Sequence, residues 1–374
     1  MNESELKQRI LMSLENQGFN YNPHVRPPQQ DKTTFKTLQQ KSRIEQIQLH
    51  KKFLSTTLKT VKQYIPHGKD IEPNEITLEL RTVKAESLEG KLFNWWNFIW
   101  WSVPYQRGYG RLMRFLLWDT THNAPFGLIS LQSPILSMSI RDDFLEIPRN
   151  EKDIWINQSM QAQRLGALPP YHELIGGKMA ALAVVSNEIR ESYKNKYTDV
   201  KTRLKNRILA PQLLFITTTS AFGRSSIYNR LTYQDELVAQ SLGYTKGSGS
   251  FHIPEELYLE LIHFLSERGE NVARSFGHGP SRKIKLLNKG LKLLGLPNCT
   301  YHNIHREFFL FPLVKNLKAV IKHQQQPEFY DRSLNDLFAF WQARWCLPKA
   351  KRNQAWKDFN SNQFLENIVK TYSL

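Results

Sequence analysis

The sequence predicts an α/β protein of the α+β kind, with a mixed sheet flanked by helical elements at both ends of the chain. Two apolar runs, RLMRFLLWD and FGLISLQSP, are separated by TTHNAP, whose polar and proline residues favour the turn of a β-hairpin. The segment MAALAVVSNEIRESYKNKY has helical spacing, and PQLLFITTTS after it predicts a buried strand. A hairpin, a helix and further strands in this order are typical of a mixed α/β core.

The chain is expected to divide into three segments. Residues 1–70 form an N-terminal helical appendage, with helices over 4–16 and 38–65 and a polar linker between them. Residues 76–255 form the α/β core, which ends with a strand or hairpin at LGYTKGSGSFHIP. Residues 256–374 form a C-terminal helical and basic region, because EELYLELIHFLSE, SRKIKLLNKGLKLLG and LNDLFAFWQARW have helical spacing.

The charge balance predicts a polyanionic partner. The 51 Lys and Arg side chains against 34 Asp and Glu leave a net charge of +17, which exceeds the roughly 2–8 charges that keep a small domain soluble. Nucleic acid, with DNA as the expected form, is favoured over an anionic membrane surface or phosphorylated ligands. Two cysteines, no apolar signal core at the start and no apolar run near the roughly 20 residues of a membrane span lead us to expect a cytoplasmic protein.

The helix expected after residue 281 predicts the main contact with nucleic acid. Its basic face holds Arg282, Lys285, Lys289 and Lys292, and its apolar face holds Ile284, Leu287, Leu291 and Leu294. Ser281 is the expected N-cap. The face could be solvated without a partner, but the charge of the whole chain favours contacts to the phosphate backbone.

A second candidate site follows the strand in FITTTSAFGRSSIYNRL. Thr218, Thr219 and Ser220 lie at the carboxyl end of the expected strand, and open α/β sheets bind ligands at the carboxyl ends of their strands. Gly223 allows a close approach of the backbone, while Arg224 and Arg230 supply guanidinium groups for phosphate. The alternative is a buried strand with a solvated loop. The tryptophans of FNWWNFIWW could stack on bases, but packing in the core is the preferred interpretation.

Several segments taken together resemble the DruA family of Druantia anti-phage defence systems. The matching segments, in consistent order, are GRLMRFLLWD, GLISLQSP followed by IRDDF, LIGGKMAALAVVS, FITTTSAFGRSSIYNRL, LGYTKGSGSFHIP and HREFFLFPLVKN. They span about 110–316, and the pair LIGGK and TTSAFGRSSIYNRL is specific. One departure is RDDFLEI, where relatives commonly continue with Ile-Gly-Trp. The resemblance implies a role in phage defence together with other Druantia proteins, which include a large helicase.

The core is also distantly similar to the N-acetyltransferase (GNAT) fold. LIGGKMAALAVV occupies the place of the glycine loop and helix that hold the cofactor pyrophosphate, which assigns a cofactor role to Ile175, Gly176, Gly177 and Lys178. The same resemblance makes Tyr228 a general acid. Because the loop lacks the usual Arg/Gln-x-x-Gly spacing, the fold is expected to persist even without the cofactor, and no cofactor is assigned.

The rival class of function is an enzyme, either a GNAT-like acyltransferase that modifies nucleic acid or a metal-dependent nuclease. Its catalytic candidates are Tyr228, Ser220 and Asp142. A nuclease needs carboxylates that converge on Mg²⁺, for which Asp143 and Glu146 are the neighbours of Asp142. On a strand, Arg141 and Asp142 would point to opposite faces and could not form one simple pair; without another acidic motif, a surface turn is preferred to a metal site for this segment. Cys299, His302 and His305 imitate half of a zinc site on a helix, but no fourth ligand is evident and no metal is assigned.

Overall fold

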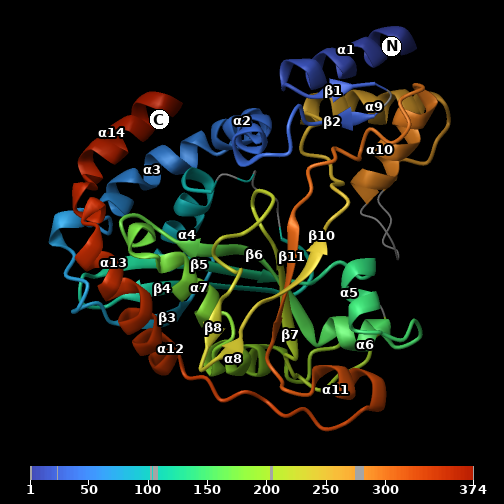
Figure 1. The fold of residues 1–374 in the computed structure, drawn as a ribbon. Helices are drawn as coiled ribbons and strands as arrows, with labels where there is room; N and C mark the ends of the chain where they lie inside the picture. The colour runs from blue at the N-terminus through green and yellow to red at the C-terminus, as the bar shows by residue number, and fades with distance from the viewer. Residues whose placement is uncertain are drawn as a thin grey trace.

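A seven-stranded sheet forms the centre of the computed structural model, which describes residues 2–22, 24–101, 103, 108–202, 205–273 and 282–373 (Figure 1). The strand order is β10-β11-β7-β6-β5-β4-β3. Neighbouring strands are antiparallel except for β6 and β7, which are parallel. The mixed sheet with its surrounding helices confirms the predicted α+β class.

The strands of this sheet are β3 (Leu78–Thr82), β4 (Leu112–Asp119), β5 (Ala124–Gln132), β6 (Ser159–Ala167), β7 (Phe215–Thr219), β10 (Gln240–Tyr244) and β11 (Glu307–Pro312). Two small hairpins pair β1 (Asn20–Tyr21) with β2 (Val25–Arg26) and β8 (Thr232–Tyr233) with β9 (Glu236–Leu237). The helices are α1 (Glu3–Asn16), α2 (Lys32–Leu49), α3 (Lys51–Lys62), α4 (Leu88–Ile99), α5 (Ser139–Phe144), α6 (Lys152–Asn157), α7 (Gly176–Ala183), α8 (Asn187–Tyr197), α9 (Glu255–Glu267), α10 (Arg282–Leu293), α11 (Leu317–His323), α12 (Leu334–Trp341), α13 (Leu347–Arg352) and α14 (Ser361–Tyr372). No helix within these ranges is long and apolar enough to cross a bilayer.

The hairpin β4–β5 is buried on both faces, which explains its continuous apolar sequence. Phe115 and Leu117 pack in the core that includes α7 and α12, while Leu116 and Trp118 pack in the core on the opposite face. A strand covered on both faces has no solvent side on which polar residues would alternate. The predicted hairpin is therefore confirmed, and so is the interpretation of the tryptophan cluster as packing, because α4 buries Trp95 on the second face.

Two long predicted helices are each interrupted. The helix expected over 38–65 ends at Leu49, and α3 begins after His50. The single helix expected after residue 178 is divided into α7 and α8. The division occurs because Ser186 caps α8 by accepting a hydrogen bond from the Ile189 backbone amide.

The N-terminal end of the chain and a later segment form one helical lobe, consisting of α1, α9, α10 and the hairpin β1–β2, beyond the ends of β10 and β11 (Figure 1). Its apolar core combines residues 6–38 with residues 253–304. The division into 1–70, 76–255 and 256–374 stays a prediction. Within the last of these segments, β11 lies between β7 and β10 in the sheet.

Glu307, the first residue of β11, is a buried carboxylate with three donors. Its oxygens accept hydrogen bonds from the Ser225 backbone amide (2.9 Å), the Asn229 side-chain amide (2.9 Å) and the Ser241 hydroxyl (2.8 Å). Its backbone amide donates to Ser220 Oγ at 3.0 Å. These contacts join the loop after β7, strand β10 and strand β11, and residues 226–230 of that loop form turns.

We expect Glu307→Ala to lower the free energy of unfolding by about 3 kcal/mol or more, because it leaves buried donors without an acceptor. Glu307→Gln should cost less, since its amide still accepts at one end and can donate to the Ser241 hydroxyl at the other. Urea unfolding followed by circular dichroism measures both. Glu366→Ala, at an exposed position on α14, is the control; equal stability of the Glu307→Ala and Glu366→Ala proteins would contradict the role of Glu307.

Candidate nucleic-acid interface

Helix α10 is amphipathic, as the sequence predicts. Leu287 and Leu291 are buried in the core of the lobe, whereas Lys285, Lys289 and Lys292 are exposed and Arg282 is half-buried. Gly290 permits a close approach to α9, because a Cβ there would lie 2.6 Å from Leu261 Cγ. The packing of α10 on α9 therefore fixes which face of the helix carries its charges toward solvent.

Part of this basic face is neutralised within the lobe. Lys289 forms an ion pair with Glu270, and Lys283 pairs with Glu255 at 2.5 Å. Arg282 and Lys292 form no ion pair with the residues that the structure describes. The expected cap Ser281 lies outside the described residues.

Arg224 and Arg230 extend from the loop that Glu307 holds. Both are exposed, and within the described ranges neither forms an ion pair. Phe222 of the same loop packs against the core of the helical lobe. The loop therefore places Arg224 close to the junction of sheet and lobe.

Ser220 and Tyr228 are both engaged in internal contacts. The Ser220 hydroxyl donates to the Gly223 carbonyl and accepts from the Glu307 amide. The Tyr228 ring lies 5.1 Å from the ring of Phe309, and its burial raises the pKa of the phenol well above the ordinary value. Both residues thus support the sheet, and their catalytic assignment stays a prediction.

The glycine loop before α7 is closely packed against other parts of the chain. A Cβ on Gly176 would lie 2.6 Å from the Tyr171 carbonyl oxygen, and one on Gly177 would lie 3.1 Å from Ile227 Cδ1. Both contacts give the glycines a packing role.

The neighbours of these glycines contact the C-terminal helices. Trp341 Nε1 donates to the Ile175 carbonyl oxygen at 3.1 Å, and Lys178 Nζ lies 4.8 Å from the Trp345 ring centroid. Burial lowers the pKa of Lys178. The cofactor role of Ile175, Gly176, Gly177 and Lys178 stays a prediction.

The expectation for Arg141 and Asp142 is wrong, because they lie on helix α5 and form an ion pair. Arg141 Nη2 is 2.6 Å from Asp142 Oδ1, and Lys152 Nζ is 2.7 Å from Asp142 Oδ2. Glu146 instead pairs with Lys322 at 2.5 Å. Within the part of the chain that the structure describes, no three His, Cys, Asp or Glu side chains gather as metal ligands.

The expected helix through Cys299, His302 and His305 is also wrong, since this segment is irregular. His302 Nδ1 accepts from the Ile304 amide at 3.1 Å, and His305 Nδ1 donates to the Thr245 carbonyl at 2.9 Å. The three side chains are therefore held by separate partners.

His302 forms a buried pair with His252, with ring centroids 5.5 Å apart. His252 Nε2 donates to the Cys299 carbonyl at 2.6 Å, and its Nδ1 is buried without a hydrogen-bond partner among the described residues. Burial lowers the pKa of His252 to about 4. Burial, His252 and Arg306 lower the pKa of His302 to about 2. Both rings are therefore neutral at neutral pH.

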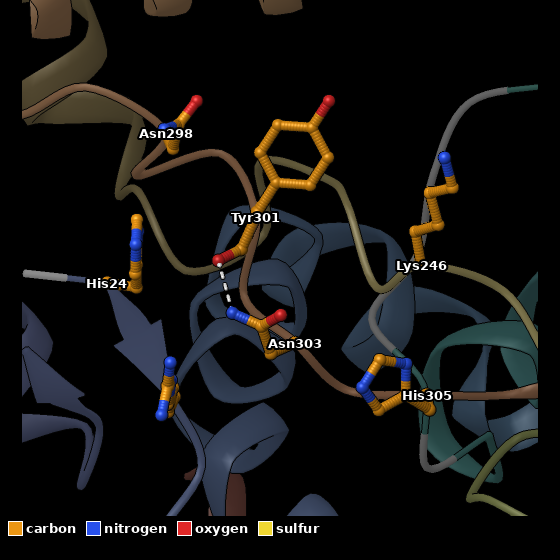
Figure 2. Close-up of a pocket in the computed structure, with 7 residues that line it drawn as sticks. His24, Lys246, Asn298, Tyr301, Asn303 and His305 are labelled. Carbon is orange, nitrogen blue, oxygen red and sulfur yellow. Dashed lines mark hydrogen bonds between the residues drawn. The ribbon is translucent and has the colours of Figure 1, made fainter.

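Sequence reasoning missed a cleft of about 490 Å³ at the junction of the sheet and the lobe (Figure 2). Its lining residues are His24, Arg26, Lys246, Asn298, Tyr301, Asn303 and His305. Three segments far apart in the sequence supply them. In the sequence, the polar run that includes CTYHNIHR is the only sign of a site in this region. It suggested half of a zinc site and not a cleft.

A family model described as "Druantia protein DruA" matches residues 29–323 of the chain. The Druantia protein DruA of Escherichia coli (strain UMEA 4076-1) is 31% identical over 391 aligned positions, which cover 99% of this chain and 96% of that protein. No solved structure matches. The similarity to the acetyltransferase fold therefore stays a prediction.

The buried histidine pair predicts that the protein loses stability in acid. A histidine in the unfolded chain has a pKa of about 6.5. Below that pH the two histidines become protonated in the unfolded chain, whereas His252 and His302 stay neutral in the folded chain. The contribution of the two histidines to the free energy of unfolding is fully present above about pH 6.5. It decreases toward pH 4 by about 1.4 kcal/mol per pH unit for each histidine.

The double variant His252→Gln, His302→Asn keeps a hydrogen-bonding group near each contact but cannot titrate. Its free energy of unfolding in urea should therefore fall less between pH 7 and pH 4.5 than that of the unmodified protein. His323→Gln, at an exposed position, is the control. The same pH dependence in the double variant and the unmodified chain would show that the pair does not titrate in this way.

Proposed function

This chain belongs to the DruA family of Druantia proteins, and from that premise we propose that it is the component of an anti-phage defence system that binds nucleic acid through its basic surface. It acts with other Druantia proteins, among them a helicase. Double-stranded DNA is the expected form of the nucleic acid, because a rigid duplex presents a continuous row of phosphates to a fixed helix.

The observation that carries this proposal is the exposed basic face of α10. Three lysines of one face are exposed, and the leucines of the opposite face fix the orientation of the helix. The net charge of +17 has the same sign. A cationic surface on a rigid helix attracts the phosphate backbone without reading the bases.

The loop after β7 supplies a second group of cations. Arg224 and Arg230 are exposed, and a guanidinium group can donate two parallel hydrogen bonds to one phosphate. Contacts of this kind release counterions, so affinity should decrease steeply with salt concentration and depend little on base sequence.

We expect the quadruple variant Arg282→Glu, Lys285→Glu, Lys289→Glu and Lys292→Glu to bind duplex DNA at least ten-fold more weakly, with a smaller dependence on salt. The reason is that the variant replaces phosphate attraction with repulsion along a face that is not part of the apolar core. Fluorescence anisotropy over a series of salt concentrations measures both effects.

Helix α3 offers a matched control for this variant. It carries four exposed lysines, Lys51, Lys52, Lys59 and Lys62. Changing all four to Glu alters the net charge by the same amount at the opposite side of the molecule (Figure 1). Equal loss of binding in the two variants would mean that total charge, and not the α10 face, determines affinity.

In cells, a defence system that carries the quadruple α10 variant should lose its protection in a plaque assay, because the component no longer engages nucleic acid. The system with the α3 variant should protect as the unmodified system does, provided that immunoblots show equal amounts of protein. Unchanged phage resistance after deletion of the gene would contradict the role in defence itself.

A further inference from the structure

The cleft between the hairpin β1–β2 and the segment before β11 has the composition of a nucleotide site. Its volume of about 490 Å³ lies within the roughly 300–1,000 Å³ of small-ligand pockets. Among the described residues, its lining includes two permanent cations, Arg26 and Lys246, and no carboxylate. Both cations are exposed, and neither forms an ion pair within the described part of the chain.

A tyrosine ring lies among these polar groups. Tyr301 is 43% exposed, and within the described residues no other aromatic ring packs on it. Figure 2 shows Asn298 and Lys246 on the two sides of this ring. A flat, exposed ring beside cations is the arrangement on which unpaired bases stack in proteins that bind single strands.

Asn303 gives the cleft a fixed hydrogen-bond acceptor. Its Nδ2 donates to the carbonyl oxygens of Val25 (2.7 Å) and Tyr301 (3.3 Å), which fixes the orientation of the amide. Its backbone carbonyl accepts from Gln30 at 2.7 Å. Figure 2 shows the Asn303 side-chain oxygen on the side of His305 and Lys246.

His305 supplies a second acceptor on the same side. Because its Nδ1 donates to the Thr245 carbonyl oxygen at 2.9 Å, the other ring nitrogen is the one left to accept a hydrogen bond from a ligand. Two acceptors in one cleft fit the exocyclic amino group of a base such as adenine, which donates two hydrogen bonds.

We propose that this cleft binds one unpaired nucleotide of a nucleic-acid strand, with the base stacked on Tyr301 and its neighbouring phosphates on Arg26 and Lys246. The proposal rests on the proposed function and adds to it a contact with a base, which the basic face of α10 does not make. A single-stranded segment thus becomes the ligand of the junction between sheet and lobe.

The test compares two short oligonucleotides of equal charge, one fully abasic and one with a single adenine among abasic residues. The unmodified protein should bind the adenine-bearing strand about 5- to 100-fold more tightly, the range that stacking of one base supplies. Tyr301→Ala should abolish this ratio, and Tyr301→Phe should retain it, because Phe keeps the stacking ring.

Lys246→Ala should weaken binding of both strands by the same factor, and Lys59→Ala on α3 should not. Equal binding of the two strands by the unmodified protein would contradict the proposal that the cleft binds a base. It would leave the phosphate contacts of the proposed function unaffected. Absence of binding to either strand also overturns the assignment of the cleft, and the proposed function then depends on the separate measurement with duplex DNA. Equal behaviour of Lys246→Ala and Lys59→Ala overturns the assignment of the phosphate position.

Discussion

The buried carboxylate of Glu307 is the interaction on which the arrangement of the candidate surface depends. It accepts hydrogen bonds from Ser225, Asn229 and Ser241, which belong to the loop after β7 and to β10. An unpaired buried carboxylate would be costly, so the presence of several donors is required for this residue to be buried. The same contacts determine where the exposed arginines of the loop lie.

The second constraint is the packing of the N-terminal residues against the internal segment 253–304 in the helical lobe. Residues 6–38 and 253–304 share one apolar core, so α1 stabilises α9 and α10 although they are far apart in the sequence. Arg9 adds contacts to Glu256 and Glu260 on α9. This packing places Arg26 of the hairpin and Lys246 of the loop after β10 in the lining of one cleft.

The junction of sheet and lobe concentrates positive charge at some energetic cost. Burial lowers the pKa of Arg306 to about 10, yet this leaves the guanidinium protonated at neutral pH. Its Nε has no hydrogen-bond partner within the described residues. The neighbouring His302 is neutral, which avoids a second buried cation.

The sequence by itself determined the elements whose signals are local. Periodic apolar residues predicted the hairpin β4–β5, and the amphipathic α10 followed from the spacing of its leucines and lysines. Packing could likewise be predicted for Trp95 and Trp96, because indoles bury large apolar areas. The division of the long helices was missed, since the cap at Ser186 resembles any other serine within a helical pattern.

Only the tertiary structure decided how distant segments meet. Glu307, in the run EFFLFP, carries no local sign that Ser225 and Ser241 will supply its donors. The ion pair of Arg141 with Asp142 depends on a helix, α5, too short to be read from periodicity. The cleft needs residues from three segments at once. Hydrophobic spacing specifies which side of an element is buried, but long-range packing alone determines which elements it is buried against.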